Sequence, residues 1–380
     1  RTPIAKFQGG LSEVRADDLA AIVLKEIVKR NPQIPAEEIE DVILGCANQA
    51  GEDNRNVARM ASLLAELPIK IGGETVNRLC ASGMAAIANA YRAIAIGEGE
   101  IYLAGGVEQM TRAPYVLSKS AQPFGRDVQL FDSSFGWRFI NPKMKELYGV
   151  DGMGETAENL AEIYKISREA QDEFALLSQQ KAAAAQNSGR LAQEIVNVEI
   201  PQKKGEPKIF SEDEFVKPDT TLDKLAKLRP AFKKEGGSVT AGNSSGLNDG
   251  AAAMILASED AVKKYNLKPL AKIISSAVVG VEPRIMGIGP VEATKKALSR
   301  ANLSLEDMDI IELNEAFAAQ ALSVLQELGI DAKDERLNPN GGAIALGHPL
   351  GMSGTRIVGT AALELQKKNK KYALCTLCIG

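Results

Sequence analysis

Helix-like and strand-like spacings of apolar residues alternate along most of the chain. Between residues 18 and 30 the apolar positions recur at helical intervals, and residues 41–45 form a short apolar run that predicts a strand. A helix rich in small residues is predicted at 80–96, and another strand at 101–105. Repeated strand–helix–strand alternation predicts an α/β fold with a mostly parallel sheet covered by helices.

An internal repeat relates the two ends of the chain. Residues 34–44 match residues 303–313, apolar on apolar and acidic on acidic, at a constant offset of 269. Residues 101–104 match residues 372–375 at an offset of 271. Two matches with similar offsets and in the same order predict two duplicated β/α halves.

The stretch between the two halves has a different character. Residues 111–240 hold the only tryptophan and most of the charge-rich turns, which predicts an insertion packed on the duplicated core. We therefore expect an N-terminal half at 1–110, completed by about 241–262. A loop domain follows at 111–240, and a C-terminal half at 263–380.

Composition and charge exclude several classes of protein. Lys plus Arg number 45 and Asp plus Glu 49, giving a net charge of −4, which argues against a nucleic-acid partner. No uninterrupted apolar run approaches the roughly 18 residues that would predict a membrane-spanning helix, so no membrane association is expected. Four cysteines are too few for a disulfide scaffold, and we expect a reducing, cytoplasmic location.

The two ends of the sequence look trimmed. The chain starts at Arg1 without a methionine, and it stops at Gly380 directly after an apolar run at 372–379 that predicts a strand. We expect that terminal segments have been removed, which leaves an organellar location open.

Cys80 is the first candidate for chemistry. The segment Asn77-Arg-Leu-Cys-Ala-Ser-Gly83 places it at or near the N-terminus of the predicted helix. The partial positive charge of a helix end favours a thiolate over a thiol. A buried structural cysteine, the usual fate of a free thiol, stays open as the alternative.

His348 is the only histidine, and it lies in a stretch with five glycines among residues 338–354. Such a loop leaves little side-chain bulk in the way of a bound substrate, although a structural histidine remains the alternative. Gly342 and Gly347 have the spacing of a phosphate-binding loop. His348 and Pro349 stand where that motif requires Lys and Ser or Thr, so the nucleotide hypothesis fails.

Two further groups are ambiguous from the residues alone. Cys375 and Cys378 form a C-x-x-C, but no second pair completes a zinc site, and we expect no metal. Residues three apart in a strand point to opposite faces, so one of these thiols can face a site. Asn314 follows the predicted strand of the second half and either caps a helix or holds an oxygen at the strand's C-terminal end.

Six segments together resemble the thiolase family. They are the Cys80 segment, Gly105-Gly-Val-Glu-Gln-Met110, Gly242-Asn-Ser-Ser-Gly-Leu-Asn-Asp-Gly250, Asn314-Glu-Ala-Phe317, Gly347-His-Pro-Leu-Gly351 and Cys378-Ile-Gly380. Because they follow the family's order, the resemblance covers essentially the whole chain. It implies a thiolase-like fold, in which two duplicated β/α halves form a five-layer α-β-α-β-α core with an inserted loop domain that carries CoA-binding elements.

The resemblance also implies an activity, the CoA-dependent thiolytic cleavage of a 3-ketoacyl-CoA through an acyl-cysteine intermediate, which reverses a Claisen condensation. Cys80 matches the nucleophile, His348 the base, and Cys378 the group that protonates the acetyl-CoA carbanion. One implied oxyanion hole uses His348 with a water held by Asn314. The other uses the backbone N–H groups of Cys80 and Gly380.

The implied binding residues fall into two groups. Arg229 and Ser245 match contacts to CoA, which is a co-substrate, and no permanently bound cofactor is expected. Met153, Met286 and Phe317 match walls of the acyl pocket. The family also implies a homodimer or homotetramer, and acyl-CoA and CoA as the small-molecule partners.

The loop over the acyl group departs from the pattern of thiolases dedicated to acetoacetyl-CoA. Those typically carry His-Met-Gly, and this chain has Asp151-Gly-Met-Gly154. Gly152 removes a side chain, so we expect a longer or polar acyl chain to fit. The segments Gly136-Trp-Arg138 and Ile140-Asn-Pro-Lys-Met144 are similar to degradative thiolases, including those that act on 3-oxoadipyl-CoA. The resemblance therefore implies a medium-chain or 3-oxoadipyl-type substrate, with an acetoacetyl-CoA-forming acetyltransferase as the alternative. Two hypotheses of other classes remain, a decarboxylating condensing enzyme and a non-enzymatic CoA or lipid carrier. A Cys-His-His condensing site would need a second histidine, which the chain lacks.

Overall fold

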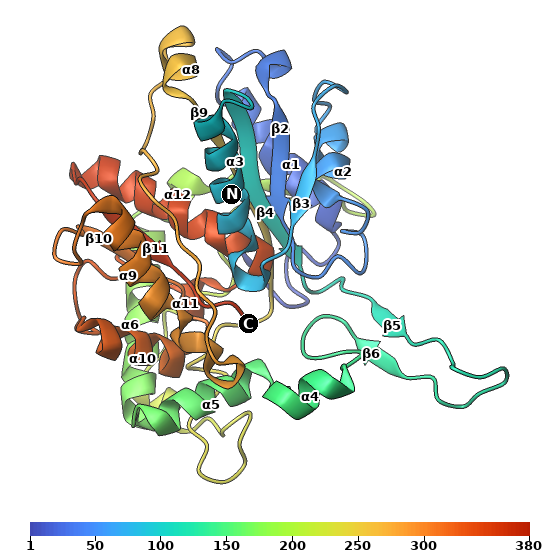
Figure 1. Ribbon diagram of the computed structural model, residues 1–380, viewed down its shortest axis with the longest axis vertical. Helices are drawn as coiled ribbons and strands as arrows, with labels where there is room; N and C mark the ends of the chain where they lie inside the picture. Colours follow the sequence, from blue (N-terminus) through green and yellow to red (C-terminus); the bar gives the residue numbers. More distant parts are fainter.

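Two β-sheets share a central layer of helices in the computed structural model, which describes residues 1–380 (Figure 1). The first sheet has the strand order β1-β9-β4-β2-β3. β2 pairs in parallel with β3 and β4, whereas β9 is antiparallel to both β4 and β1. Its strands are β1 (Ala5–Lys6), β2 (Asp41–Gly45), β3 (Glu74–Val76), β4 (Ile101–Gln109) and β9 (Asn248–Ala257).

The second sheet consists of two parallel strands, β10 (Ile310–Leu313) and β11 (Ala373–Thr376). Its register repeats that of the first sheet. Asp41 lies opposite Tyr102 in the β2–β4 pair, and Ile310 lies opposite Ala373 in the β10–β11 pair. Residue 310 follows residue 41 by 269, and residue 373 follows residue 102 by 271, which are the two offsets of the sequence repeat. The two halves are therefore duplicated down to the pairing of individual residues.

Helices complete five α-β-α-β-α layers, as the family resemblance implies. Three pairs cover the sheets: α1 (Ala16–Lys29) with α2 (Val57–Leu64), α3 (Ser82–Ile96) with α12 (Leu350–Lys368), and α9 (Gly289–Ala301) with α10 (Ala318–Leu328). α1 and α2 cover the outer face of the first sheet, while α3 and α12 lie between the sheets. α9 and α10 lie beyond the second sheet.

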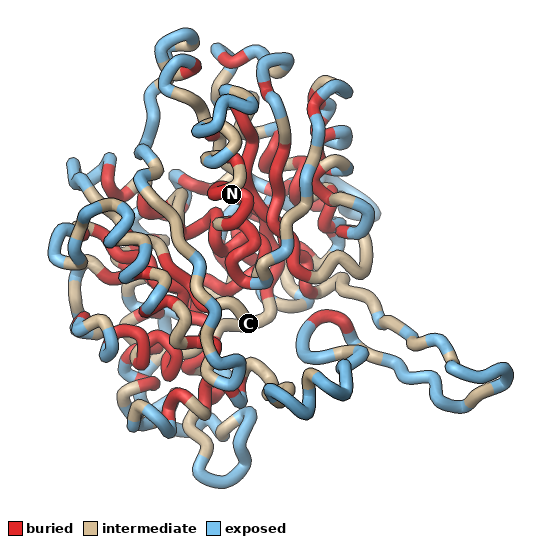
Figure 2. Tube along the Cα trace, viewed as in Figure 1, coloured by how far each residue is buried: buried red, intermediate tan, exposed pale blue.

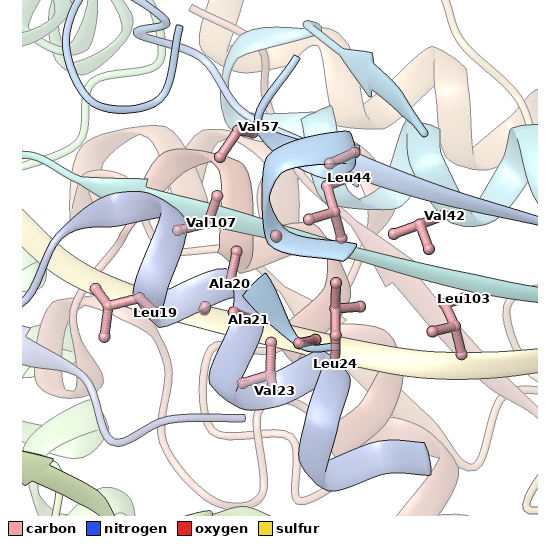
Figure 3. Close-up of a cluster of buried hydrophobic side chains, with 14 of the residues drawn as sticks. Leu19, Ala20, Ala21, Val23, Leu24, Val42, Leu44, Val57, Leu103 and Val107 are labelled. Carbon is pink, nitrogen blue, oxygen red and sulfur yellow. The ribbon is translucent and has the colours of Figure 1, made fainter. Parts of the chain in front are cut away.

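The hydrophobic core of the first half lies between α1, α2 and the sheet (Figure 3). Leu19 and Leu24 of α1 face Leu44 of β2 and Leu103 of β4, and all four are fully buried. Burying each such side chain contributes about 1.5–3 kcal/mol. Figure 2 shows the buried residues concentrated in the sheets and the central helices.

The helix predicted at 80–96 is apolar enough to cross a membrane by length and composition, but it is a core helix. It comprises the short 3₁₀ turn η2 (Leu79–Ala81) and α3. α3 packs against β4 on one side and α12 on the other. Its apolar residues are therefore explained by contacts inside the molecule.

The region between the halves contributes helices and two hairpins. Its elements are β5 (Tyr115–Leu117), β6 (Leu130–Asp132), α4 (Pro142–Tyr148), α5 (Met153–Ile163), α6 (Arg168–Asn187), η3 (Leu191–Glu194), β7 (Val198–Ile200), β8 (Lys208–Phe210) and α7 (Leu222–Ala226). The remaining short helices are η1 (Ala36–Glu38), α8 (Glu259–Lys264), η4 (Pro283–Ile288) and α11 (Ala343–Leu346). The β5–β6 hairpin extends away from the body of the molecule (Figure 1).

Two strands differ in length from their predictions. β4 does not end at residue 105 but continues through Gly106 to Gln109. A Cβ on Gly106 would collide with the backbone oxygen of Gly351, so the glycine lets α12 lie directly on the strand. The run at 372–379 forms a strand only over Ala373–Thr376, because its last residues leave the sheet and enter the site described next.

Candidate active site

Cys80 lies in the η2 turn at the entrance to α3 and is buried. The backbone N–H groups of Gly380 and of Cys80 itself act on its Sγ and favour the thiolate. The turn is fixed by Ser82, whose hydroxyl accepts from Arg78 N and donates to Leu79 O, at 2.8 and 2.7 Å. The nucleophile is thus held against the C-terminal residues by backbone geometry.

Burial outweighs the helix end in setting the state of Cys80. The expectation from sequence was that the helix N-terminus would favour a thiolate. Instead, removal from water raises the pKa of Cys80 to about 11, although the two N–H groups act in the opposite direction. The expectation was wrong because it counted the helix end and not the desolvation. The resting group at neutral pH is a thiol.

His348 is oriented by a hydroxyl directly beneath it. Its Nδ1 lies 2.6 Å from Ser353 Oγ, and that hydroxyl donates its own proton to Pro349 O at 2.9 Å. Ser353 can therefore only accept from the imidazole, so Nδ1 carries the proton and Nε2 is left as the basic nitrogen. Burial, with a smaller effect of the Arg356 charge, lowers the pKa of His348 to about 3, so the resting imidazole is neutral.

The backbone around His348 is held by two side chains that sequence reasoning did not select. Asn248 Oδ1 accepts from His348 N at 2.9 Å, and Glu108 accepts from Gly351 N at 2.8 Å. Both lie within segments that carry the family resemblance, but their roles depend on partners 100 and 243 residues away. Ser353 was missed for a different reason, since it stands only five residues from His348. It lies in the first turn of α12, a helix that was not predicted from the sequence.

Asn314 follows β10 directly and is fully buried. Its Nδ2 lies 3.4 Å from His348 Nε2, and its backbone N–H donates to Thr376 O at 3.0 Å. Its Oδ1 is buried without a partner, which suits an atom that binds substrate or water. Asn314 does not cap the next helix, because Phe317 occupies that position.

Cys378 lies just beyond β11 in a buried cluster with Met286 and Ala316, against which Met153 and Phe317 pack. Its pKa is raised well above the usual range by burial, with a smaller contribution from the neighbouring Cys80. The structure therefore brings the predicted second cysteine next to the nucleophile and surrounds it with the predicted acyl-pocket residues.

The two cysteines of the C-x-x-C face different surroundings. Cys375 Sγ lies 3.7 Å from Ile357 O in α12, away from Cys378, and all four cysteines are free. One group of potential metal-ligand atoms lies close together, formed by Cys46, Asp53 and Glu108. Glu108 is already committed, since its carboxylate accepts backbone N–H groups at three positions.

A cavity of about 890 Å³ opens beside Cys375 and Cys378, whereas Cys80, His348 and Asn314 are not among its lining residues. Met153, Met286, Cys378 and Gly380 line it, and a Cβ at Gly380 would collide with Met153 Sδ. The pocket wall and the backbone N–H donor therefore meet at Gly380. Phe317 packs on the other side of Met153 and Cys378.

The two predicted CoA contacts differ in position. Ser245 donates its N–H to Ala316 O at 2.9 Å, so it adjoins the cluster around Cys378. Arg229 is exposed beyond the end of α7, and no contact joins it to the catalytic residues. Neither residue lines the large cavity.

The arrangement supplies what acyl transfer needs. A buried thiol can hold an acyl group, a neutral imidazole can accept a proton, and a second thiol can act as acid and base. Backbone N–H groups at the nucleophile can stabilise a developing oxyanion in surroundings that largely exclude water.

Comparison with known proteins finds similarity to thiolases over the whole chain. Family models described as the thiolase N-terminal and C-terminal domains match residues 1–260 and 267–380. The chain is 59% identical over 380 residues to a 3-oxoadipyl-CoA/3-oxo-5,6-dehydrosuberyl-CoA thiolase of Escherichia coli (strain K12), covering 100% of this chain and 94% of the relative. A beta-ketoadipyl-CoA thiolase of Acinetobacter baylyi is 58% identical with the same coverage.

More distant relatives carry another name. An acetyl-CoA acetyltransferase of Chromobacterium violaceum is 48% identical over 381 residues, covering 100% of this chain and 95% of the relative. The crystal structure of the Bacillus anthracis acetyl-CoA acetyltransferase superposes with a TM-score of 0.92 at 42% identity, covering 100% of this chain and 93% of that one.

Proposed function

The chain belongs to the thiolase family and is an acyltransferase with CoA as its co-substrate, and from this premise we propose that it cleaves 3-oxoadipyl-CoA to acetyl-CoA and succinyl-CoA. The observation that carries the proposal is the 57–59% identity, over the whole chain, to relatives named for 3-oxoadipyl-CoA or beta-ketoadipyl-CoA. The open cavity beside Met153 and Met286 supports it, because the acyl group must extend beyond that of acetoacetyl-CoA.

The first half-reaction makes the acyl-enzyme. The Cys80 sulfur attacks the 3-keto carbon while the thiol proton passes to His348 Nε2, the nitrogen that the Ser353 contact leaves unprotonated. The keto oxygen becomes an oxyanion, stabilised by the N–H groups of Cys80 and Gly380. The bond between C2 and C3 then breaks, and Cys378 protonates the departing carbanion to give acetyl-CoA.

The leaving group passes through an enolate whose thioester oxygen also needs donors. Protonated His348 and a water on Asn314 supply them, since Asn314 Oδ1 has no partner within the chain. The proton on His348 then passes to the Cys378 thiolate, which restores both groups.

The second half-reaction transfers the acyl group to CoA. His348 accepts the proton of the incoming CoA thiol, and the CoA sulfur attacks the thioester carbonyl carbon. The bond to Cys80 breaks, and its sulfur recovers the proton from His348. The net change is the addition of CoA–SH across the C2–C3 bond.

Thiolysis assays on 3-oxoadipyl-CoA and acetoacetyl-CoA, monitored by acetyl-CoA release, test this proposal. We expect kcat/KM for 3-oxoadipyl-CoA to exceed that for acetoacetyl-CoA, and both activities to be lost in Cys80→Ala and Cys378→Ala. Preference for acetoacetyl-CoA would contradict the substrate and favour the acetyltransferase alternative. Full activity of Cys378→Ala would contradict the two-cysteine mechanism and favour a Cys-His-Asn condensing type.

We also propose that the protein is a homodimer or homotetramer in the cytoplasm. The β5–β6 hairpin supports association, because Tyr115, Leu117 and Leu130 are exposed on it although they are apolar. The four free cysteines fit a reducing compartment.

A further inference from the structure

A charged network lies at the wall of the acyl cavity. Asp151 stands two residues before Met153, and Arg284 two residues before Met286, so the network adjoins both methionines of the pocket. Arg284 Nε donates to Asp151 Oδ2 at 2.9 Å. Asn159 Nδ2 donates to the same carboxylate oxygen and to the backbone oxygen of Arg284, each at 2.9 Å.

This network fixes Arg284 but leaves most of its guanidinium free. The contact through Nε is the only hydrogen bond that the side chain makes, so Nη1 and Nη2 have no partner within the chain. The side chain lines the cavity and remains 58% exposed. A planar guanidinium with both terminal nitrogens free can bind a carboxylate through two parallel hydrogen bonds.

We propose that Arg284 is a specificity-determining residue that binds the far carboxylate of a dicarboxylic acyl group. The inference rests on the proposed function and deepens it. In 3-oxoadipyl-CoA the carboxyl carbon is the third carbon beyond the keto carbon that Cys80 attacks. Met153 and Met286 both line the cavity, and Arg284 is the cavity-lining cation nearest to them in sequence, so we expect it to meet the carboxylate of an acyl chain that passes between them. The ion pair with Asp151 uses Nε and leaves both terminal nitrogens unoccupied.

Five other cations line the cavity, namely Arg78, Arg92, Lys272, Lys370 and Lys371. Arg92 lies 12 residues beyond Cys80 along a helix, a distance of roughly 18 Å. Arg78 is close to Cys80 in sequence and is therefore the matched control.

Kinetics on two six-carbon substrates, 3-oxoadipyl-CoA and 3-oxohexanoyl-CoA, isolate the carboxylate. For Arg284→Ala we expect kcat/KM on 3-oxoadipyl-CoA to fall about 10- to 100-fold, mainly through KM, because a charge-assisted contact is lost. On 3-oxohexanoyl-CoA the same variant should stay within about twofold, which also shows that it folds. Arg284→Lys should recover part of the loss, and Arg78→Ala should change both substrates to the same extent.

The outcomes separate the two proposals. Equal loss on both substrates, or no change on either, would overturn the role of Arg284. A selective loss in Arg78→Ala but not in Arg284→Ala would transfer the role to Arg78 and overturn the inference as well. Failure of the unaltered protein to cleave 3-oxoadipyl-CoA, while it cleaves 3-oxohexanoyl-CoA, would instead overturn the proposed substrate.

Discussion

The thiol of Cys80 and the imidazole of His348 are both removed from water, and burial disfavours the charged form of each. A neutral pair means that the proton moves during attack and not before substrate binds. Proton transfer from Cys80 to His348 Nε2 therefore becomes favourable only when the sulfur attacks the carbonyl of a bound substrate. This distinguishes the site from a preformed thiolate–imidazolium pair.

Alkylation of Cys80 measures its protonation directly. Because burial raises the pKa of Cys80 to about 11 and only the thiolate reacts, iodoacetamide labelling should become about tenfold faster per pH unit between pH 7 and 9. Mass spectrometry of the labelled peptide gives the rate, and Cys80→Ser identifies labelling at other thiols. A rate that levels off near neutral pH would mean that the helix end, and not burial, controls this residue.

Ser353 should matter for turnover more than for stability. Ser353→Ala leaves the Nδ1–H of His348 buried without an acceptor and allows the other tautomer, at a cost of about 1–3 kcal/mol. We expect kcat to fall about 10- to 100-fold with a small change in KM.

Ser323→Ala is the matched control for Ser353→Ala. Ser323 is also a buried helical serine, and it also donates to the backbone oxygen four residues earlier. Ser323 does not touch His348, so the kcat of Ser323→Ala should stay within about twofold of that of the unaltered protein. An equal effect of the two substitutions would show that Ser353 acts on the helix and not on the imidazole.

At the scale of elements, close contact between β4 and α12 sets the position of His348. Gly106 allows α12 to lie against the strand at Gly351, three residues after the catalytic histidine. Gly106→Ala forces the two elements apart, so we expect the free energy of unfolding to drop by about 1–3 kcal/mol and activity to fall as well. Thermal melting and thiolysis rates measure both effects.

A glycine in α12 offers a control for Gly106→Ala. Gly359 lies inside α12, and a Cβ there would meet only Met254 Cε at 3.9 Å, an ordinary contact. Gly359→Ala should therefore stabilise the helix by about 0.5–1 kcal/mol and leave activity unchanged. A Gly106→Ala variant as stable as Gly359→Ala would contradict the close-contact argument.

Strand boundaries could be predicted where they depend on nearby residues, and not where they depend on contacts with distant parts of the chain. β2 has the predicted boundaries because its apolar run is local, and the repeat predicted the two duplicated halves, whose strands the structure pairs in the same register. The length of β4 was missed because Gly106 is required by a contact with Gly351, which lies 245 residues away in the sequence. The site follows the same rule. Cys80 and His348 stand in distinctive local sequences, whereas Asn248 matters only because the fold brings it to the backbone of His348.

At the scale of the whole molecule, the β5–β6 hairpin is the feature that one chain does not explain. It extends from the body with largely exposed residues (Figure 2), and Leu117 and Leu130 face each other across it, 64% and 65% exposed. An isolated two-stranded hairpin is marginally stable in water. Contact with a second copy of the chain would cover these side chains and explain how the hairpin stays ordered.

Leu117→Glu combined with Leu130→Glu tests that explanation, because two carboxylates on the paired positions oppose burial against another chain. We expect multi-angle light scattering to give a dimer or tetramer for the unaltered protein and a smaller assembly for the double variant. Ile209→Glu, on the exposed β8 strand, is the control and should keep the original mass. If the double variant keeps that mass as well, or if the unaltered protein is a monomer, the hairpin does not mediate assembly. Because Cys80, His348 and Cys378 all come from one chain, the smaller assembly should retain thiolysis in proportion to the protein that stays folded.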